Sequence, residues 1–187
     1  MIAEVRTVAD LAALTAAGQR VKYLHFWGHT PARDGSVSAS CLSQWSPEGF
    51  TVDGIRFATA EHYMMWGKAT LFGDTAMAAQ ILASGHPRQA KTLGGRVARF
   101  DQQVWNDNRF AIVVTGNLAK FHQNPDLGTF LAGTGTRVLV EASPMDRIWG
   151  IGLTRDDPRA DDPARWRGLN LLGFALMEVR SRLGAEG

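Results

Sequence analysis

The stretch FATAEHYMMWGKATLFGD, residues 57–74, predicts the helix around which the fold is built. Thr59 can cap its N-terminus, because a threonine hydroxyl can accept a hydrogen bond from a backbone N–H one turn on. Good helix formers fill 60–70, with Gly67 as the only weak residue. One face of this helix carries a carboxylate, two thioethers and an ammonium: Glu61, Met64, Met65 and Lys68.

The charges at the two ends of this face have two interpretations. In the first, Glu61 only complements the positive N-terminus of the helix, and Lys68 extends its ammonium to water. In the second, both charges belong to a chemical site, because a charge at each end of an apolar stripe is unusual for a core face. The helix alone leaves both open.

A β-hairpin precedes this helix. In FTVDGIRF (50–57), Asp53 and Gly54 form the pair favoured in a type I′ turn, where both positions need positive φ. The aromatic and β-branched run VKYLHFW (21–27) predicts a strand, and residues 38–46 predict a return to extended structure. A further strand is expected within 133–143, with Val138 and Val140 on one face and Leu139 and Glu141 on the other.

The remaining segments are mainly helical. Helices are expected over 75–85 after Asp74, from Pro87 to the Gly94–Gly95 pair, over 104–122 after Asp101, near 127–133, and from Asn170 to Gly184. Apolar residues place one broad buried face on the 104–122 helix: Val104, Phe110, Val113, Val114, Leu118 and Phe121. Residues 154–168 are dense in Asp, Arg and Pro, which predicts a solvated loop or lid.

These elements predict an α+β fold that is mostly helical, with a small β-sheet in a single compact domain. A short helix is expected in an N-terminal extension, residues 1–20, and the domain is expected to span 21–187. The length of 187 residues suits one domain with a sizeable core.

Composition narrows the classes of protein. Hydrophobic residues make up 45% and charged residues 20%, which describes an ordinary globular protein. The net charge of +2 is too small to argue for nucleic-acid binding by itself. The start lacks the pattern of a signal peptide, and no stretch reaches the ~20 apolar residues of a membrane span, so a cytoplasmic location without a membrane partner is expected.

The sequence contains none of the common metal or nucleotide motifs. A single cysteine, Cys41, excludes an intramolecular disulfide, and the five histidines have no paired spacing that would bind zinc. We therefore expect no metal and no cofactor, and activity that survives EDTA. A Rossmann site is not predicted, because the glycines of 133–136 precede a strand instead of opening a helix.

A glycine-rich loop near residue 150 has the composition of a binding site. Asp146 and Trp149 stand in DRIWGIG (146–152), directly after a predicted strand. Loops at strand ends commonly contact ligands, and Trp149 can stack on a base or a sugar. Trp105 and Trp27 could serve in the same way, although most of the six tryptophans are expected to be core residues.

Several segments occur together in the order of a known family. They are EHYMMWGKATLFGD (61–74), AKTLGGRV (90–97), the W-N-x-x-R segment (105–109), KFHQNPDLGTFLAGTG (120–135), LVEASPMDRIWGIG (139–152) and NLLGFALMEVR (170–180). Together they resemble the NADAR family, also called YbiA-like proteins, from about Trp27 to Arg180. The resemblance implies a largely helical α+β fold and hydrolysis of N-glycosidic bonds. It implies, as substrates, ribosylamino intermediates of the riboflavin pathway or guanine bases that carry ADP-ribose.

The resemblance also assigns site residues. The functional positions of the family fall on Glu61, Lys68, Trp105, Asp146 and Trp149. Gln44 and Asn170 are further predicted substrate contacts. Gln44 stands where many members have asparagine, so its longer amide is expected to affect the choice of substrate.

The leading hypothesis is therefore an N-glycosidase for a nucleotide-like ribosyl or ADP-ribosyl substrate, which could be part of a modified nucleic acid. Glu61 and Asp146 could share the acid and stabilising roles, as the two carboxylates of glycosidases do. Alternatively, Lys68 could attack a ring-opened ribose and form a Schiff base. A non-catalytic module that binds NAD or ADP-ribose is the main alternative, and a nucleic-acid-binding protein is a third.

Two structural expectations follow. Glu61, Lys68, Asp146 and Trp149 should line one cleft. Burial of Lys68 against Met64 and Met65 should lower its pKa, and nearby carboxylates should raise it. We expect the carboxylates to have the larger effect, so that the ammonium stays charged in the resting enzyme.

Overall fold

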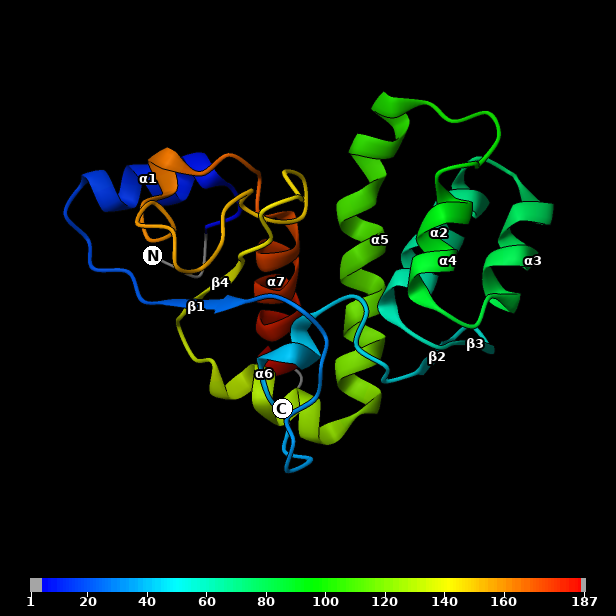
Figure 1. The fold of residues 1–187 in the computed structure, drawn as a ribbon, viewed down its shortest axis with the longest axis horizontal. Coiled ribbons are helices and arrows are strands. Elements are labelled where there is room, and N and C mark those ends of the chain that lie inside the picture. The colour runs from blue at the N-terminus through cyan, green and yellow to red at the C-terminus, as the bar shows by residue number, and fades with distance from the viewer. Residues whose placement is uncertain (1–4, 186–187) are drawn as a thin grey trace. The chain divides into compact units, whose positions relative to one another are not determined.

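The computed structural model describes residues 5–185, which form two compact units (Figure 1). The first unit contains the described residues up to Ser43 and those from Asp126 onwards, and the second is Gln44–Pro125. Seven α-helices and four short strands are present among the described residues, so the prediction of a mostly helical α+β fold is confirmed. In this part of the chain, no helix is long and apolar enough to cross a membrane.

The second unit begins with the predicted hairpin. Strands β2 (Phe50–Val52) and β3 (Ile55–Phe57) pair antiparallel, and Phe50 lies opposite Phe57. Asp53 and Gly54 both have positive φ, 49° and 78°, as a type I′ turn requires. The prediction of the hairpin is confirmed.

Four helices complete this unit: α2 (Ala60–Leu71), α3 (Thr75–Ala83), α4 (Pro87–Gly94) and α5 (Gln102–Gln123). Thr59, Asp74 and Asp101 cap α2, α3 and α5 with their side chains, so the predicted Thr59 cap is confirmed. Helix α2 packs against the other three. The hairpin and α2 share an aromatic core, in which Tyr63 meets Phe57 edge-on at a centroid distance of 4.9 Å.

The predicted buried face of α5 is partly wrong. Val104 is 41% exposed, while Trp105 and Arg109, which were not assigned to that face, are buried. The reason is the phase of the helix, since residues at spacings of three and four share a face and Trp105 starts a different stripe from Val104. The stripe that begins at Trp105 continues through Val113 to Phe121.

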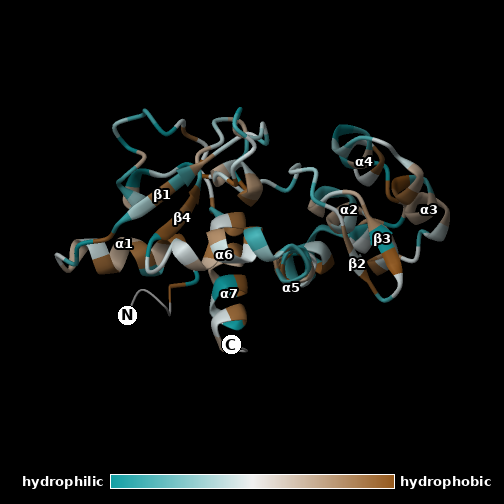
Figure 2. Cartoon of the chain, turned by 90° about the horizontal axis from the view of Figure 1, so that it is seen from below, coloured by the Kyte–Doolittle hydropathy of each residue, from teal (hydrophilic) through white to brown (hydrophobic). Residues whose placement is uncertain are grey.

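The first unit contains a parallel pair of strands, β1 (Tyr23–Phe26) and β4 (Val138–Glu141). The small β-sheet of the prediction is therefore two separate two-stranded sheets. Strand β4 is hydrophobic along most of its length, as Figure 2 shows, and both of its faces are buried. The α7 helix (Leu171–Ala185) packs against β4, and the other helices of this unit are α1 (Val8–Ala16) and α6 (Pro125–Gly133).

Two loops of the first unit differ from the prediction. Residues 39–42 form the 3-10 helix η2 (Ala39–Leu42) instead of extended structure. No β-branched residue lies in this segment, and the Cys41 N–H donates to the Ser38 carbonyl (3.0 Å), which closes a tight turn. The 154–168 loop is mainly exposed, but it contains the 3-10 helix η3 (Pro163–Arg165) and buries Ala160 and Pro163.

Gly173 allows α7 to approach the backbone of β4. A Cβ atom at this position would lie 2.0 Å from the Leu139 carbonyl oxygen, which is backbone and cannot move aside. We expect Gly173→Ala to reduce the free energy of unfolding by about 3 kcal/mol, which urea unfolding can measure. The control is Gly184→Ala in the same helix, where a Cβ meets nothing within 4 Å. It should be neutral or stabilise by up to about 1 kcal/mol, and equal effects of the two variants would contradict the packing argument.

Candidate functional site

Helix α2 presents the face that the sequence predicted. Glu61, Met64 and Met65 are buried, and Lys68 is half-buried. Glu61 and Lys68 are seven residues apart, so about 10 Å of helix separates them along the axis. The two charges therefore define the ends of a stripe and do not form a direct ion pair through the helix.

Lys68 lies in a cage of aromatic rings and one carbonyl. Its Nζ donates to the Gly94 carbonyl (2.9 Å) and lies 4.2 Å from the centroid of the Phe100 ring and 5.7 Å from that of Trp105. Burial lowers the pKa of Lys68 below its ordinary value. The amine therefore needs less driving force to become neutral and nucleophilic than a solvated lysine does.

The expected upward shift of the Lys68 pKa by nearby carboxylates is not observed. Desolvation by burial lowers this pKa instead, and the charge of the amine in the resting enzyme stays a prediction. Glu61 is two helical turns away, and the groups near Nζ, namely Phe100, Trp105 and the Gly94 carbonyl, carry no formal charge.

Gly94 positions the wall of this cage. A Cβ at Gly94 would lie 2.1 Å from the sulfur of Met65. Its absence lets the end of α4 pack against α2, and this close approach places the Gly94 carbonyl within hydrogen-bond distance of Lys68. The cage therefore depends on a packing contact as well as on the lysine.

The other end of the stripe holds a buried amide pair. The Glu61 N–H donates to the Gln44 carbonyl (2.9 Å), and the Asn117 Nδ2 donates to Gln44 Oε1 (2.8 Å). Gln44 Nε2 and Asn117 Oδ1 are both buried, and neither has a hydrogen-bond partner among the described residues. Gln44 thus contacts α2 through its backbone and α5 through its side chain, and its role as a substrate contact stays a prediction.

Sequence reasoning missed three polar residues of α5: Arg109, Asn117 and Lys120. All three are buried, and Lys120 has an exposed fraction of 0%. Burial lowers the pKa of Arg109, whose Nε has no hydrogen-bond partner in the described chain. Their burial could have been predicted from their spacing, because they recur every three or four residues on the same stripe of the helix as Trp105 and Val113.

His62 is buried on α2, and both of its ring nitrogens have partners within the protein. Its Nε2 lies 3.0 Å from the Ser84 carbonyl, which only accepts, so Nε2 carries the proton. Nδ1 then accepts from the Thr59 hydroxyl (2.8 Å). Burial lowers the pKa of His62 below its ordinary value of 6.5, and the ring stays neutral in this arrangement.

This histidine predicts a loss of stability in mild acid. Below pH 6.5 the unfolded chain binds a proton at His62 that the folded chain, with its lowered pKa, does not bind. The free energy of unfolding therefore falls as the pH drops from 6.5 towards that lowered pKa, by at most about 1.4 kcal/mol per pH unit. Urea unfolding across this window should show a shallower slope for His62→Gln than for the wild type. Identical slopes would show that another group causes the loss of stability below pH 6.5.

In the first unit, Asp146 organises the glycine-rich loop. Its Oδ1 accepts from the N–H groups of Ile148 (2.9 Å) and Trp149 (2.8 Å). Both of these hydrogen bonds use Oδ1, and the side chains of Asp146 and Trp149 are partly exposed. One carboxylate oxygen thus holds the turn, and the role of Asp146 towards a substrate stays a prediction.

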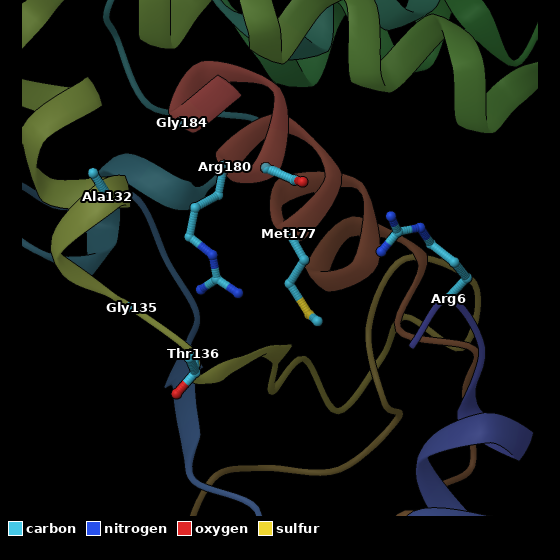
Figure 3. Close-up of a pocket in the computed structure, with 8 residues that line it drawn as sticks. Arg6, Ala132, Gly135, Thr136, Met177, Arg180 and Gly184 are labelled. Carbon is cyan, nitrogen blue, oxygen red and sulfur yellow. The ribbon is translucent and has the colours of Figure 1, made fainter. Parts of the chain in front are cut away.

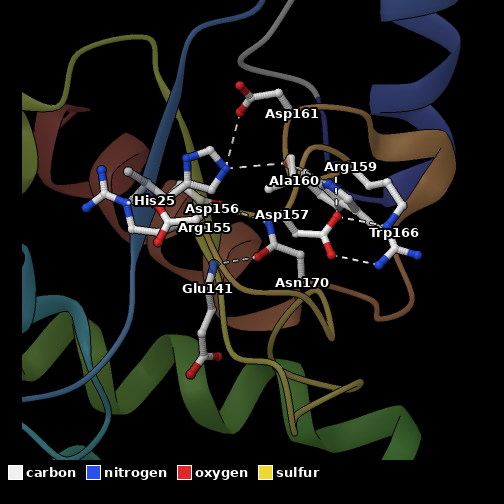
Figure 4. Close-up of polar contacts among 11 residues, drawn as sticks. His25, Glu141, Arg155, Asp156, Asp157, Arg159, Ala160, Asp161, Trp166 and Asn170 are labelled. Carbon is white, nitrogen blue, oxygen red and sulfur yellow. Dashed lines mark hydrogen bonds and ion pairs between the residues drawn. The ribbon is translucent and has the colours of Figure 1, made fainter.

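Asn170 is fixed in the interior of the same unit. Its Oδ1 accepts from the Glu141 N–H (3.0 Å) and its Nδ2 donates to the Leu139 carbonyl (2.9 Å), and Figure 4 shows the first of these contacts. The exposed fraction of Asn170 is 0%. The amide therefore ties α7 to β4, and its role as a substrate contact stays a prediction.

The structure groups the predicted site residues by unit. In the second unit, Lys68 and Trp105 share one cage, and Gln44 and Glu61 share a backbone hydrogen bond. Asp146, Trp149 and Asn170 belong to the first unit. A cleft common to both sets stays a prediction. Within residues 5–185, no group of three His, Cys, Asp or Glu side chains is arranged to bind a metal ion.

Comparison with known proteins identifies the family. The NADAR domain model matches residues 25–184. The chain belongs to the NADAR family. An N-glycosidase of Acanthamoeba polyphaga mimivirus is 42% identical over 164 residues, which are 85% of this chain and 95% of that protein. The N-glycosidase YbiA of Escherichia coli K12 is 29% identical over 135 residues, covering 72% and 76% of the two chains.

A solved structure supports the fold of this NADAR protein. The NMR structure of E. coli YbiA superposes with a TM-score of 0.68 and 24% sequence identity, covering 90% of this chain and 88% of that one. At this identity the likeness concerns the fold alone. The expectation drawn from the ordered segments of the sequence, that the chain is a YbiA-like NADAR protein, is therefore confirmed.

Proposed function

We propose that this NADAR protein is a hydrolase that breaks an N-glycosyl bond in a nucleotide-like substrate. Its relatives from mimivirus and E. coli are named N-glycosidases. The observation that carries the proposal is the caged amine of Lys68, whose pKa is lowered, on the same helical face as the buried carboxyl group of Glu61. A module that only binds NAD or ADP-ribose has no need for such an amine.

In the first route, Lys68 is the nucleophile. Its neutral nitrogen attacks the anomeric carbon of the opened ribose, and the bond from that carbon to the base nitrogen breaks. The departing nitrogen takes a proton from a carboxylic acid, for which Glu61 is the candidate. Water then attacks the Schiff base, which releases the sugar as an aldehyde and returns the amine. The sum is one water added across one C–N bond.

In the second route, two carboxyl groups catalyse the reaction. Positive charge develops on the anomeric carbon as the bond lengthens, and an anionic oxygen nearby stabilises it. The Oδ2 of Asp146 is suited to that role, since its Oδ1 is held by the loop. Glu61 then protonates the leaving nitrogen, and water attacks the sugar directly. Lys68 acts in this route as a fixed donor or charge.

The finer assignment concerns the substrate. We propose either a guanine base that carries ADP-ribose or a ribosylaminopyrimidine phosphate, with Trp105 and Trp149 beside the base or the sugar. Trp149 is better placed for stacking, because it is partly exposed while Trp105 is 8% exposed. A cytoplasmic location also stays a prediction.

One experiment tests the activity and its substrate together. The protein is incubated separately with ADP-ribosylated guanosine and with a ribosylaminopyrimidine phosphate, and the products are identified by mass spectrometry. We expect one of them to yield the free base or amine together with the sugar phosphate product, with one solvent oxygen incorporated from labelled water. Release of neither base at high enzyme concentration would contradict the proposed substrate class.

A further inference from the structure

A cavity of about 310 Å³ opens beyond the ends of β1 and β4, entirely within the first unit. The two parallel strands end at the same edge, where the Ala142 N–H donates to the Phe26 carbonyl (2.9 Å). The walls come from the end of β1, from η2, from Ala142 and from residues 154–156. In open parallel sheets, ligands bind outside the carboxyl ends of the strands, which is the position of this cavity.

An exposed aromatic ring forms one wall. Trp27 directly follows β1 and is 65% exposed. A large ring that is left in contact with water has a free face, on which a flat heterocycle can stack. Sequence reasoning noted Trp27 as a possible stacking residue, but neither proposed route uses it.

An arginine side chain lines the same cavity. The Arg155 side chain is 73% exposed, and its ion pair with Asp156 is long at 3.9 Å, with the carboxylate 92% exposed. Such an exposed pair contributes little. The guanidinium therefore keeps donors for a phosphate, which it can bind with two parallel hydrogen bonds. Asp156 on the same rim disfavours a second anionic group beside the first.

The loop that carries Arg155 is held in place. The Ala160 carbonyl accepts from Trp166 Nε1 (2.8 Å), and the His25 Nε2 lies 3.4 Å from both that carbonyl and the Asp161 carboxylate (Figure 4). Arg159 donates twice to the Asp157 carboxylate, at 2.8 and 2.7 Å. These contacts hold the segment that follows the cavity wall, and the Asp157 N–H donates to the Thr154 carbonyl (3.1 Å) at the wall itself. An ordered backbone here reduces the entropy lost when a ligand binds.

Another cavity of the first unit, about 290 Å³, contains two guanidinium groups (Figure 3). Its cations are already engaged, since Arg6 pairs with Glu178 at 2.7 Å. Arg180 donates to the Thr134 hydroxyl (2.7 Å) and to the Arg137 carbonyl (2.9 Å). An anion there would compete with these contacts, whereas at Arg155 it competes only with one long ion pair.

We propose that the cavity at the strand ends binds a nucleoside 5′-monophosphate group, with the base stacked on Trp27 and the phosphate on Arg155. Ser40 and Thr154 also line the cavity, so their hydroxyls are candidate partners for the ribose, and Ser40 Oγ shares a hydrogen bond with Ser38 Oγ (2.9 Å). The volume is at the lower end of the range for ligand pockets, which suits one nucleotide and not two. None of the residues that the two routes use lines this cavity, so the site is separate from those residues, and only its use as a substrate subsite rests on the proposed hydrolysis.

Titration of the full chain with AMP tests the site without any turnover, by isothermal calorimetry and by the fluorescence of tryptophan. We expect Trp27→Ala and Arg155→Ala each to weaken binding by about tenfold or more. The matched control is Arg165→Ala, an exposed arginine of the same loop outside the cavity, which should bind AMP like the wild type. Adenosine and ribose 5-phosphate, each lacking one of the two anchors, should bind more weakly than AMP.

Binding of AMP with equal affinity to the wild type and both cavity variants would overturn the proposal, as would no saturation below about 10 mM. The nucleotide has two sources, the distal part of the substrate or a separate ligand. Competitive inhibition of hydrolysis by AMP identifies the first, and an effect that persists at saturating substrate identifies the second. Because binding is measured directly, failure of the proposed hydrolysis and failure of this site give different results.

Discussion

Replacing Lys68 with arginine is expected to abolish turnover, by about 10³-fold or more, if the lysine is the nucleophile. Arginine keeps a positive charge and can still donate to the Gly94 carbonyl, but it stays protonated and cannot attack a carbon. Borohydride added during turnover should trap the wild-type enzyme as a covalent sugar adduct at Lys68. The variant should give no adduct in intact-protein mass spectrometry.

The pH dependence of the residual rate of a Glu61→Gln enzyme, in which the proposed acid no longer titrates, provides an independent check. The nucleophilic form of Lys68 is the neutral amine, so kcat/KM of this variant in the Schiff-base route rises with pH and levels off above the pKa of Lys68. Burial lowers this pKa, which shifts the rise to lower pH than a solvated lysine would give. A lysine that acts only as a charge gives the opposite sign, a rate that falls as the ammonium deprotonates.

The matched control is Lys91→Arg, a substitution of the same type on the exposed side of α4. It should leave rate and trapping unchanged, and urea unfolding should show that both variants are folded. A Lys68→Arg enzyme that retains most of the wild-type rate, with no adduct trapped in either protein, would exclude the Schiff-base route. The carboxylate route would then stand.

Local signals in the sequence were enough for the elements that position the site. The Asp53–Gly54 turn and the Thr59 cap depend on the residues themselves, so the hairpin and α2 were predictable. The buried face of α5 was harder to predict from the sequence. Val104 and Trp105 are both apolar, and only tertiary packing decides which of them is buried. The structure places Trp105 beside Lys68 and leaves Val104 exposed.

The electrostatics of the site were not predictable from spacing. Lys68 and the carboxylate of Glu61 share a helical face, which suggested a charged neighbour for the lysine. Its actual neighbours are Phe100 and the Gly94 carbonyl, which are 32 and 26 residues further along the chain. These contacts arise from the packing of α4 and the following loop on α2, so the direction of the pKa shift needed the fold.

Glu61→Gln is expected to lower kcat by about 10²–10⁴-fold while the protein stays folded. Glutamine has the size of glutamate and keeps the backbone N–H that donates to the Gln44 carbonyl (2.9 Å), so the link between α2 and Gln44 is preserved. What it loses is the ability to give a proton to the leaving nitrogen. Both proposed routes require that step, so the loss is expected whichever role Lys68 has.

The substrate can be chosen to show which step Glu61 serves. A leaving group of low pKa needs little help from an acid, so an activated N-glycoside should restore much of the rate of Glu61→Gln if Glu61 is the acid. Glu48→Gln, in the same unit at a partly exposed position, serves as the control and should match the wild type. Equal losses on poor and activated leaving groups would instead assign Glu61 to stabilising the sugar cation. A Glu61→Gln enzyme with full activity on both would remove this carboxyl group from the site, and Asp146 would then be the remaining candidate for the acid.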